Sequence, residues 1–452
     1  MVEYDDYKEI NLPWLKKIPS NWDIERNKQF LHESKETVGD KSSEYTLLSL
    51  TLRGIVVRDL SDNKGKFPAS FDTYKVVEPG DMAFCLFDVD ETPRTVGLSN
   101  HRGMLTGAYD IFHVDGINAQ YLYYYYLALD NVKALRPLYT GLRKTININT
   151  FLSQKMPVPP RAEQDQIVRF LDWKVSAINK LIGIRRKEIQ ELEEMKRSKI
   201  GAIVMGQSRM QQKKSDITWV DTIPINWEEK PLIQYAYERC IKNVGMVEDN
   251  LLSLSYGKVI DKDINTTDGL LPASFEGYQI VEPGNIILRL TDLQNDHKSL
   301  RTGLVTRRGI ITSAYTCLET RDDILPEYLQ LELHVADLCK VFYGMGGGVR
   351  QSIGFKDIKR MIIAIPPLSE QHEILDLIHD IDAPIDKQKE QYLKIINELE
   401  ELKKAIISDV VTGKIDVQNV TVPEYEHVDD IADIDSEGDE ETDESEIYGE
   451  ED

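Results

Sequence analysis

The sequence predicts an α+β protein built from two similar mixed α/β modules, each followed by a long helix. The main observation is an internal repeat: Pro159-Pro160-Arg161-Ala162-Glu163-Gln164 is matched by Pro366-Pro367-Leu368-Ser369-Glu370-Gln371, 207 residues later. After each Pro-Pro pair, apolar residues recur at spacings of three and four. Solenoid repeats are about 20–50 residues long. A longer period therefore indicates a whole module that is used twice.

Five landmarks upstream of the Pro-Pro pairs also recur in the same order. They are, first copy before second, Ile18-Pro19-Ser20-Asn21-Trp22 and Ile223-Pro224-Ile225-Asn226-Trp227, Leu47-Leu48-Ser49-Leu50 and Leu251-Leu252-Ser253-Leu254, Pro68-Ala69-Ser70-Phe71 and Pro272-Ala273-Ser274-Phe275, Val77-Glu78-Pro79-Gly80 and Val281-Glu282-Pro283-Gly284, and Arg102-Gly103 with Ala108-Tyr109 and Arg308-Gly309 with Ala314-Tyr315. Because the offset drifts only slightly, small loop insertions account for the differences between the copies.

The first module is expected over residues 1–160 and the second over 217–367. Short β-type runs broken by Gly and Pro turns predict strands, and the clearest are Tyr45–Leu52, Met82–Phe87 and Ile286–Leu290. A helix is expected over Asn118–Asn131, with Asn118 as its cap. The tyrosines from Tyr123 to Tyr126 could stack on nucleic-acid bases, but their helical spacing favours a role in the core.

Each module is followed by a predicted long helix, over 161–206 and 368–413. Apolar residues at coiled-coil spacing form the seams, which are Ile167, Leu171, Ile178, Ile182, Ile189, Leu192 and Met195 in the first helix and Ile374, Ile378, Ile381, Ile385, Tyr392, Ile396, Leu399, Leu402 and Ile406 in the second. A helix of this length reaches roughly 60 Å. It cannot be buried within one small domain, so the two helices most simply pair with each other.

The segments outside the modules and helices are short and polar. Gly206 and Gly413 stand where C′ glycines would end the helices, and residues 207–216 are expected to be a linker. The C-terminal tail, 414–452, is expected to be disordered because it is acidic and poor in apolar residues. It could compete with phosphate for a basic face or act as a solubilising extension.

Composition limits the class of protein. The 41% of apolar residues is enough for real cores, and the four cysteines, Cys85, Cys240, Cys317 and Cys339, lack the spacing of a disulfide framework or a zinc site. No apolar run approaches the roughly 18 residues of a membrane span, so we expect a cytoplasmic protein without a membrane partner. The net charge of −23 includes 16 acidic residues after Val422, and the first module is nearly neutral. A basic face that binds nucleic acid is therefore still allowed.

Taken together, these motifs resemble one family. The Ile-Pro-x-x-Trp opening, the Glu-Pro-Gly turn before an apolar strand, a Gly-rich basic loop and Pro-Pro-x-x-Glu-Gln at the start of a long helix are similar to the specificity (S) subunit of type I restriction-modification systems. The resemblance covers residues from about 11 to 413, in both copies. The acidic tail departs from the family pattern.

The resemblance implies two target-recognition domains that each read one half of a split double-stranded DNA target. It also implies a pseudo-twofold architecture in which the helices form a long antiparallel two-helix coiled coil between these domains and dock two methyltransferase (M) subunits. Adenine methylation with S-adenosylmethionine would belong to those subunits, and ATP- and Mg-dependent translocation and cleavage to the restriction (R) subunits. This chain would need no cofactor and would not be an enzyme. Consistent with that, it lacks Asn-Pro-Pro-Tyr/Phe, Walker and HExxH motifs.

Candidate DNA contacts are cationic and amide side chains on loops, because these groups reach phosphates and base edges. The leading set lies in the equivalent Gly-rich loops before the helices and comprises Arg143, Lys144, Thr145, Arg350 and Gln351. A second set comprises Arg94, Arg102, Arg301, Arg307 and Arg308, although Arg102 and Arg308 could instead anchor a turn. A third set comprises Arg53, Arg58, Lys64, Lys66 and Lys258. A flexible turn is the alternative for the first set. No metal ligand is expected.

Because the modules resemble each other within their variable parts, we expect half-sites of related sequence in a near-inverted repeat. Three other interpretations remain open at this point. A specificity subunit of another restriction or phage-defence class would share these features, since the partner defines the class. A cytosolic coiled-coil adaptor would explain the helices and the acidity but not the module landmarks. A fused enzyme would need catalytic motifs that the sequence lacks.

Overall fold

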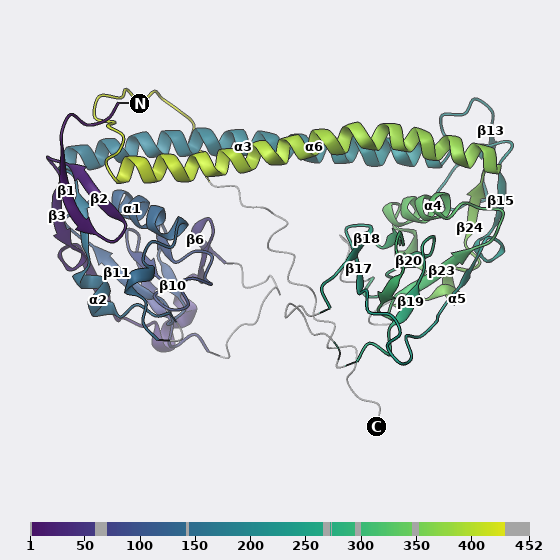
Figure 1. Ribbon diagram of the computed structural model, residues 1–452, viewed down its shortest axis with the longest axis horizontal. Coiled ribbons are helices and arrows are strands. Elements are labelled where there is room, and N and C mark those ends of the chain that lie inside the picture. Colours follow the sequence, from purple (N-terminus) through teal and green to yellow (C-terminus); the bar gives the residue numbers. More distant parts are fainter. Residues whose placement is uncertain are drawn as a thin grey trace. The chain divides into compact units, whose positions relative to one another are not determined.

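The computed structural model describes residues 2–58, 70–141, 144–264, 272, 274–293, 300–345 and 352–429. These residues form two compact units, one containing the chain up to Glu188 and again from Gln391, the other running from Ile189 to Glu390. Each unit therefore holds one mixed module and parts of both long helices (Figure 1). The predicted fold class, two similar α/β modules with two long paired helices, is confirmed.

The core of the first module is a four-stranded antiparallel sheet in the order β4-β11-β8-β9. Its strands are β4 (Leu31–Ser34), β8 (Met82–Phe84), β9 (Val96–Leu98) and β11 (Asp110–Val114). Four two-stranded antiparallel pairs surround it: β1 (Tyr7–Leu12) with β2 (Leu15–Pro19), β3 (Asp23–Arg26) with β12 (Lys155–Val158), β5 (Leu48–Thr51) with β6 (Gly54–Val57), and β7 (Lys75–Val77) with β10 (Gly103–Leu105). The predicted strands over Tyr45–Leu52 and Met82–Phe87 are thus present but shorter.

Helix α1 (Ala119–Asn131) packs against β9 and carries the tyrosine run. The Asn118 side chain accepts hydrogen bonds from the backbone N–H groups of Gln120 and Tyr121, so the predicted cap is confirmed. Tyr124, Tyr125 and Tyr126 are buried, as expected for core residues. The short helix α2 (Ile148–Ser153) follows, and its Phe151 packs against Phe84 and Tyr126.

The second module repeats this topology strand for strand. Its four-stranded antiparallel sheet has the order β16-β23-β20-β21, formed by β16 (Ala236–Glu238), β20 (Ile286–Leu288), β21 (Thr302–Leu304) and β23 (Thr316–Thr320). The surrounding pairs are β13 (Gln212–Lys214) with β14 (Thr222–Pro224), β15 (Glu228–Pro231) with β24 (Ile362–Ile365), β17 (Leu252–Ser255) with β18 (Lys258–Asp261), and β19 (Gln279–Val281) with β22 (Gly309–Ile311). Helices α4 (Pro326–Leu338) and α5 (Phe355–Ile358) take the places of α1 and α2. Strand β13 lies within the segment that the sequence predicted as a linker.

The two long helices are α3 (Arg161–Val204) and α6 (Leu368–Val411), which lie side by side (Figure 1). In the first unit, Asn179 accepts a hydrogen bond from Lys403, and Arg186 pairs with Glu400. Later residues of α3 thus contact earlier residues of α6. In the second unit, Lys196 pairs with Asp386, at 2.9 Å, and Arg209, just beyond α3, pairs with Glu373 near the start of α6. The pairing within each unit is therefore antiparallel.

The seam between these helices largely follows the predicted pattern. Among the predicted seam residues Ile178, Ile182, Ile374, Ile378, Ile385 and Ile396 are buried. Met195 and Leu402, by contrast, are exposed, and Ile407 is buried although the pattern did not include it. Arg185, between the apolar positions Ile182 and Ile189, stacks on the Tyr392 ring, 5.2 Å from its centroid, and also pairs with Glu188. The seam therefore departs from a regular heptad at these positions.

The Pro-Pro-x-x-Glu-Gln motif fixes the start of each helix to its module in the same way. Gln164 and Gln371 accept hydrogen bonds from the backbone N–H groups of Asn118 and Leu325, both 2.9 Å long. Each glutamine also donates to the carbonyl oxygen of the first proline of its motif. The glutamates bind the asparagine of the module opening: Asn21 donates to Glu163 and Asn226 to Glu370. One repeated motif therefore joins each module to its following helix.

The end of each helix contacts the tryptophan of a module opening. Gly413, just after α6, has a φ of +72°, and a Cβ there would lie 2.3 Å from Pro19 Cδ and 3.3 Å from the Trp22 ring. Gly206, just after α3, has a φ of +65°, and a Cβ there would lie 2.4 Å from Pro224 Cγ and 3.1 Å from the Trp227 ring. These glycines end the helices as predicted. Their lack of a side chain also permits the close contact with the module.

The prediction of a disordered tail from residue 414 onward is wrong for residues 414–429. The backbone N–H of Asp416 donates to the Val2 carbonyl, and Gln166 of α3 donates to the carbonyl oxygens of Val417 and Val420. Further along α3, Ser176 accepts from the Val428 N–H and Asn179 donates to the Val428 carbonyl. Polar side chains of α3 thus hold an extended segment that composition alone marks as disordered. Residues 430–452 lie outside the described part of the chain.

We predict that Gly413→Ala lowers the free energy of unfolding more than Gly245→Ala does. Both glycines have nearly the same φ, +72° and +74°, so both substitutions introduce about 1 kcal/mol of backbone strain. A Cβ at Gly245 meets nothing within 4 Å, whereas one at Gly413 collides with Pro19. The extra loss at Gly413 should be roughly 1–3 kcal/mol. Chemical denaturation of the two variants checks this, and equal losses would contradict the proposed contact.

Candidate nucleic-acid interface

Each module presents a β-hairpin that is held close to a glycine of a neighbouring strand. The hairpins are β5–β6 and β17–β18, and they have the same register, since Leu48 pairs with Val57 and Leu252 with Asp261. A Cβ on Gly103 would lie 2.4 Å from the carbonyl oxygen of Thr46, just before the first hairpin. On Gly309 it would lie 2.5 Å from the same atom of Asn250. The backbone therefore approaches these glycines more closely than any side chain would allow.

The arginine before each of these glycines carries the same ion pair in both modules. Arg102 Nε lies 3.1 Å from Glu78 Oε1, and Arg308 Nη1 lies 3.1 Å from Glu282 Oε1. The arginine side chains are 67% and 53% exposed. Arg102 also lies over the Tyr45 ring, and Arg308 makes a second ion pair with Glu248. Both guanidinium groups are thus held in place and are still accessible to solvent.

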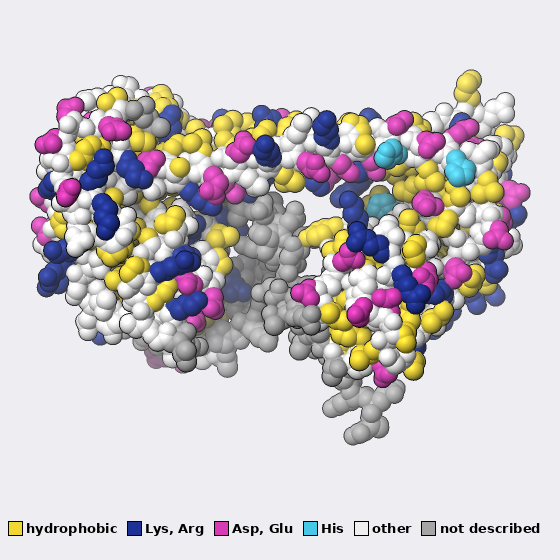
Figure 2. Space-filling model, viewed as in Figure 1, with side chains coloured by type: hydrophobic (Ala, Val, Ile, Leu, Met, Phe, Trp, Pro, Cys, Tyr) yellow, Lys and Arg dark blue, Asp and Glu magenta, His cyan; other side chains and the backbone are white. Residues whose placement is uncertain are grey.

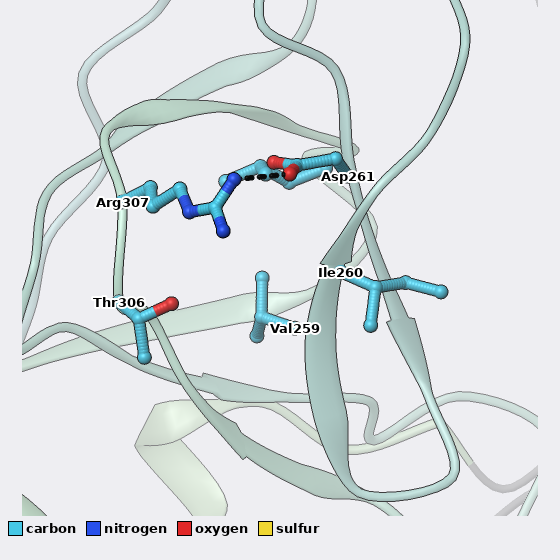
Figure 3. Close-up of a pocket in the computed structure, with 6 residues that line it drawn as sticks. Val259, Ile260, Asp261, Thr306 and Arg307 are labelled. Atoms are coloured by element: carbon cyan, nitrogen blue, oxygen red, sulfur yellow. Dashed lines mark hydrogen bonds and ion pairs between the residues drawn. The ribbon is translucent and has the colours of Figure 1, made fainter.

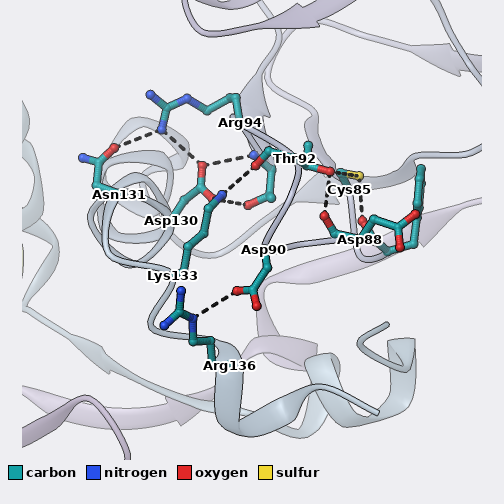
Figure 4. Close-up of polar contacts among 11 residues, drawn as sticks. Cys85, Asp88, Asp90, Thr92, Arg94, Asp130, Asn131, Lys133 and Arg136 are labelled. Carbon is teal, nitrogen blue, oxygen red and sulfur yellow. Dashed lines mark hydrogen bonds and ion pairs between the residues drawn. The ribbon is translucent and has the colours of Figure 1, made fainter. Parts of the chain in front are cut away.

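Two arginines of the second candidate set lie in the interior, contrary to their prediction as DNA contacts. Arg94 donates to Asp130 and Asn131, and its side chain is only 16% exposed (Figure 4). Arg301 is fully buried and donates to the carbonyl oxygens of Arg289 and Thr291 and to the Tyr343 hydroxyl. A phosphate or a base edge cannot reach the fully buried guanidinium of Arg301, and the partners of Arg94 likewise give it a structural role.

Their position reveals a repeated anchor that the sequence interpretation missed. Asp130 accepts a hydrogen bond from the Thr95 N–H, and Asp337 accepts the equivalent bond from the Arg301 N–H, at 3.0 and 2.9 Å. Both carboxylates are buried at the end of the helix that covers the sheet. The signal was available, because the two aspartates are separated by the same 207 residues as the Glu-Gln motifs.

Arg307 has an acidic partner on the neighbouring hairpin. Its Nη1 lies 2.6 Å from Asp261 Oδ2, and the two side chains are 71% and 49% exposed. The pair lies beside a cavity of about 200 Å³ whose apolar lining includes Leu252 and Val259 (Figure 3). Sequence reasoning selected Arg307 but not Asp261, since 46 residues separate them.

The remaining candidates are divided between described and undescribed positions. Lys144 pairs with Asp90 at 3.2 Å, and this hydrogen bond raises the pKa of Lys144. Thr145 forms an isolated bridge with Thr140. Arg53 lies in the turn between β5 and β6, Arg58 directly follows β6, and Lys258 begins β18. The residues Lys64, Lys66, Arg143, Arg350 and Gln351 lie outside the described residues, so they stay predictions.

The surface charge is mixed. On the face drawn in Figure 2, Lys and Arg side chains lie among Asp and Glu side chains.

Among the residues with assigned positions, no group of three His, Cys, Asp or Glu side chains could hold a metal ion. Over the same part of the chain, none of the helices has both the length and the apolar character that a membrane crossing requires. Arg102 and Arg308, exposed and held by the same ion pair in both modules, are the candidate sites that the two hairpin faces share.

Comparison with known proteins identifies the modules. The family model described as the type I restriction modification DNA specificity domain matches residues 106–194 and again 310–400. Both modules therefore match the type I restriction-modification DNA specificity domain. Each match begins near the end of the four-stranded sheet of one module and continues into its long helix. The family resemblance predicted from the repeated motifs is thereby confirmed.

A related protein agrees with this match. A protein of Methanocaldococcus jannaschii named as the specificity subunit of the type I restriction enzyme MjaX is 24% identical over 290 residues. That match spans 61% of this chain and 63% of the relative.

Two solved structures also match this chain. One, on complex assembly and conformational transition of the type I R-M system, contains a chain that is 12% identical with a TM-score of 0.58, and the match covers 88% of this chain and 99% of that one. This likeness supports the fold. The HsdS subunit from Thermoanaerobacter tengcongensis is 13% identical with a TM-score of 0.41, over 88% of this chain and 98% of that one.

We predict that Arg301→Met destabilises the second module, whereas Arg307→Met does not. Removing the buried guanidinium leaves the carbonyl oxygens of Arg289 and Thr291 without their donor, which should lower the free energy of unfolding by roughly 3 kcal/mol. Arg307 is exposed, so its substitution should change stability by less than about 0.5 kcal/mol. Urea denaturation of both variants provides the measurement. If Arg301→Met leaves the free energy of unfolding nearly unchanged, the structural role of Arg301 is contradicted.

Proposed function

We propose that this chain is the DNA sequence-recognition subunit of a type I restriction-modification complex, and that it binds a bipartite double-stranded target. The observation that carries the proposal is the duplication of one accessible, positioned arginine, Arg102 in the first module and Arg308 in the second. Each lies beside a hairpin whose register is the same in both modules. Two modules with the same cationic turn are suited to two half-sites of one duplex.

Within each module, the roles of the exposed residues would follow from their chemistry. A guanidinium can bind a phosphate or pair with the O6 and N7 atoms of guanine. Arg102 and Arg308 are the same in both modules, so they are suited to phosphate contacts, which set position without reading sequence. Residues that differ between the modules are better suited to base readout. On DNA binding, the phosphate would either displace the glutamate that pairs with each arginine or bind while the glutamate keeps the guanidinium in position.

The paired helices would set the spacing between the half-sites and dock two adenine-N6 methyltransferase subunits, with restriction subunits joining that assembly. S-adenosylmethionine, ATP and Mg would be bound by those partners, and the chain itself would not be an enzyme. It would act in the cytoplasm, on the DNA of the cell. Its own contribution would be to choose the sequence and to orient the partners. The antiparallel pairing in each unit and the repeated motif that joins module to helix support a rigid spacer.

We predict that the double variant Arg102→Ala and Arg308→Ala weakens DNA binding equally for specific and unrelated sequences. Each lost phosphate contact should reduce the slope of log affinity against log salt concentration by about 1, so the double variant should lose about 2. Fluorescence anisotropy over a salt series measures this slope. Lys394→Ala, an exposed helix residue paired only weakly with Glu398, is the control and should leave the slope unchanged. An unchanged slope in the double variant would exclude the phosphate role.

We further predict that the chain directs methylation to a split motif. Co-expression with a methyltransferase subunit encoded beside it, followed by single-molecule sequencing of host DNA, should reveal two short half-sites separated by a fixed gap, with one N6-methylated adenine in each. Omitting the chain should abolish the motif. A stable complex that methylates no motif would contradict the proposal and favour an adaptor or inactive variant.

A further inference from the structure

The two hairpin faces differ at several exposed positions, such as Arg53 against Gly257, and one of these differences places a donor beside an acceptor. Arg307 precedes the shared Arg308 of the second module, and the equivalent residue before Arg102 is His101. The hairpin position that pairs with Leu252 is Asp261, whereas the position that pairs with Leu48 is Val57. The second module thus has an arginine and an aspartate where the first module has a histidine and a valine.

The backbone around this place is the same in both modules. Gly103 and Gly309 allow the segment before each hairpin to lie against the neighbouring strand. The N–H groups of the next residues, Met104 and Ile310, donate to the carbonyl oxygens of Thr46 and Asn250, at 2.8 Å in each case. The neighbouring Arg102–Glu78 and Arg308–Glu282 ion pairs are also shared. A difference in what the two faces bind must therefore come from side chains that differ on this common frame.

Arg307 and Asp261 contact each other but are not needed for stability. Their ion pair of 2.6 Å is exposed to solvent at both ends, and exposed pairs usually contribute only about 0–1 kcal/mol. The pair does restrict the guanidinium. Asp261 engages Nη1, and the planar guanidinium carries five N–H donors in a fixed arrangement. The apolar side chains of Leu252 and Val259 line the adjacent cavity, which can accept the edge of a base (Figure 3).

We infer that Arg307 and Asp261 are specificity-determining residues that read a G·C pair in the half-site of the second module. An arginine pairs with the O6 and N7 atoms of guanine, and a carboxylate accepts a hydrogen bond from the N4 amino group of cytosine. Both groups are present side by side on one accessible surface. This inference rests on the proposed function. It also refines the expected relation between the half-sites: they differ at the base pair that this arginine and aspartate contact.

The test is selection of bound DNA by the complex of the full chain with its methyltransferase subunits, from a duplex library that is randomised at both half-sites. The wild-type complex defines the motif. In complexes with Arg307→Ala or Asp261→Asn, one G·C position in one half-site should lose preference by about 10- to 100-fold, while the other half-site keeps its sequence. Arg308→Ala is the matched control, since it should lower affinity without changing either half-site.

A gain-of-function variant completes the test. The double substitution His101→Arg and Val57→Asp gives the first module the pair that it lacks, and it should create a new G·C preference in the other half-site. All the substituted positions are exposed, so unfolding midpoints should stay near the wild-type value. Folded Arg307→Ala and Asp261→Asn complexes that select the wild-type motif would overturn the inference. A wild-type complex that selects no bipartite motif would instead contradict the proposed function.

Discussion

The contact of each module-opening tryptophan with the ends of the long helices is the constraint on which the rest of this structure depends. Trp22 donates a hydrogen bond to Glu163 in the first turn of α3, and its ring lies against Gly413, just beyond the end of α6. Trp227 lies in the same way against Gly206, just beyond α3, while its neighbour Asn226 bonds to Glu370 at the start of α6. The start of one helix and the end of the other are thus fixed to the same short segment.

This constraint explains why the two helices are antiparallel within each unit. A chain that leaves the first module through α3 must bring the end of α6 back to Trp22, so the two helices run in opposite directions past that module. The remaining length of each helix then pairs along a seam that tolerates irregularities such as Arg185 against Tyr392 and the exposed Met195. The residues after Gly413 continue along α3 through Gln166, Ser176 and Asn179. Only the first unit has this additional segment among the described residues.

Much of the architecture could be predicted from the sequence because it depends on residues that are close together in the chain and because it occurs in both copies of the repeat. The repeat, the helix ends at Gly206 and Gly413 and the Asn118 cap depend on near neighbours in the chain. The candidate site was harder to predict, since a charged residue looks the same in sequence whether it is buried or exposed. Arg301 is buried because Tyr343 and the carbonyl oxygens of Arg289, Thr291 and Asp292 surround it, and these partners lie 9 to 42 residues away in the sequence. Arg307 is accessible only six residues later, and its partner Asp261 could not be recognised without the hairpin register.

The central claim is that both modules bind one duplex through equivalent hairpin faces, and hydrogen exchange with mass spectrometry tests it most directly. The full complex would be measured with and without a duplex that carries the methylated split sequence. The account predicts simultaneous protection of residues 52–58 and 101–105 in the first module and of residues 256–262 and 307–311 in the second. Protection in one module alone, or in neither at saturating DNA, would contradict it.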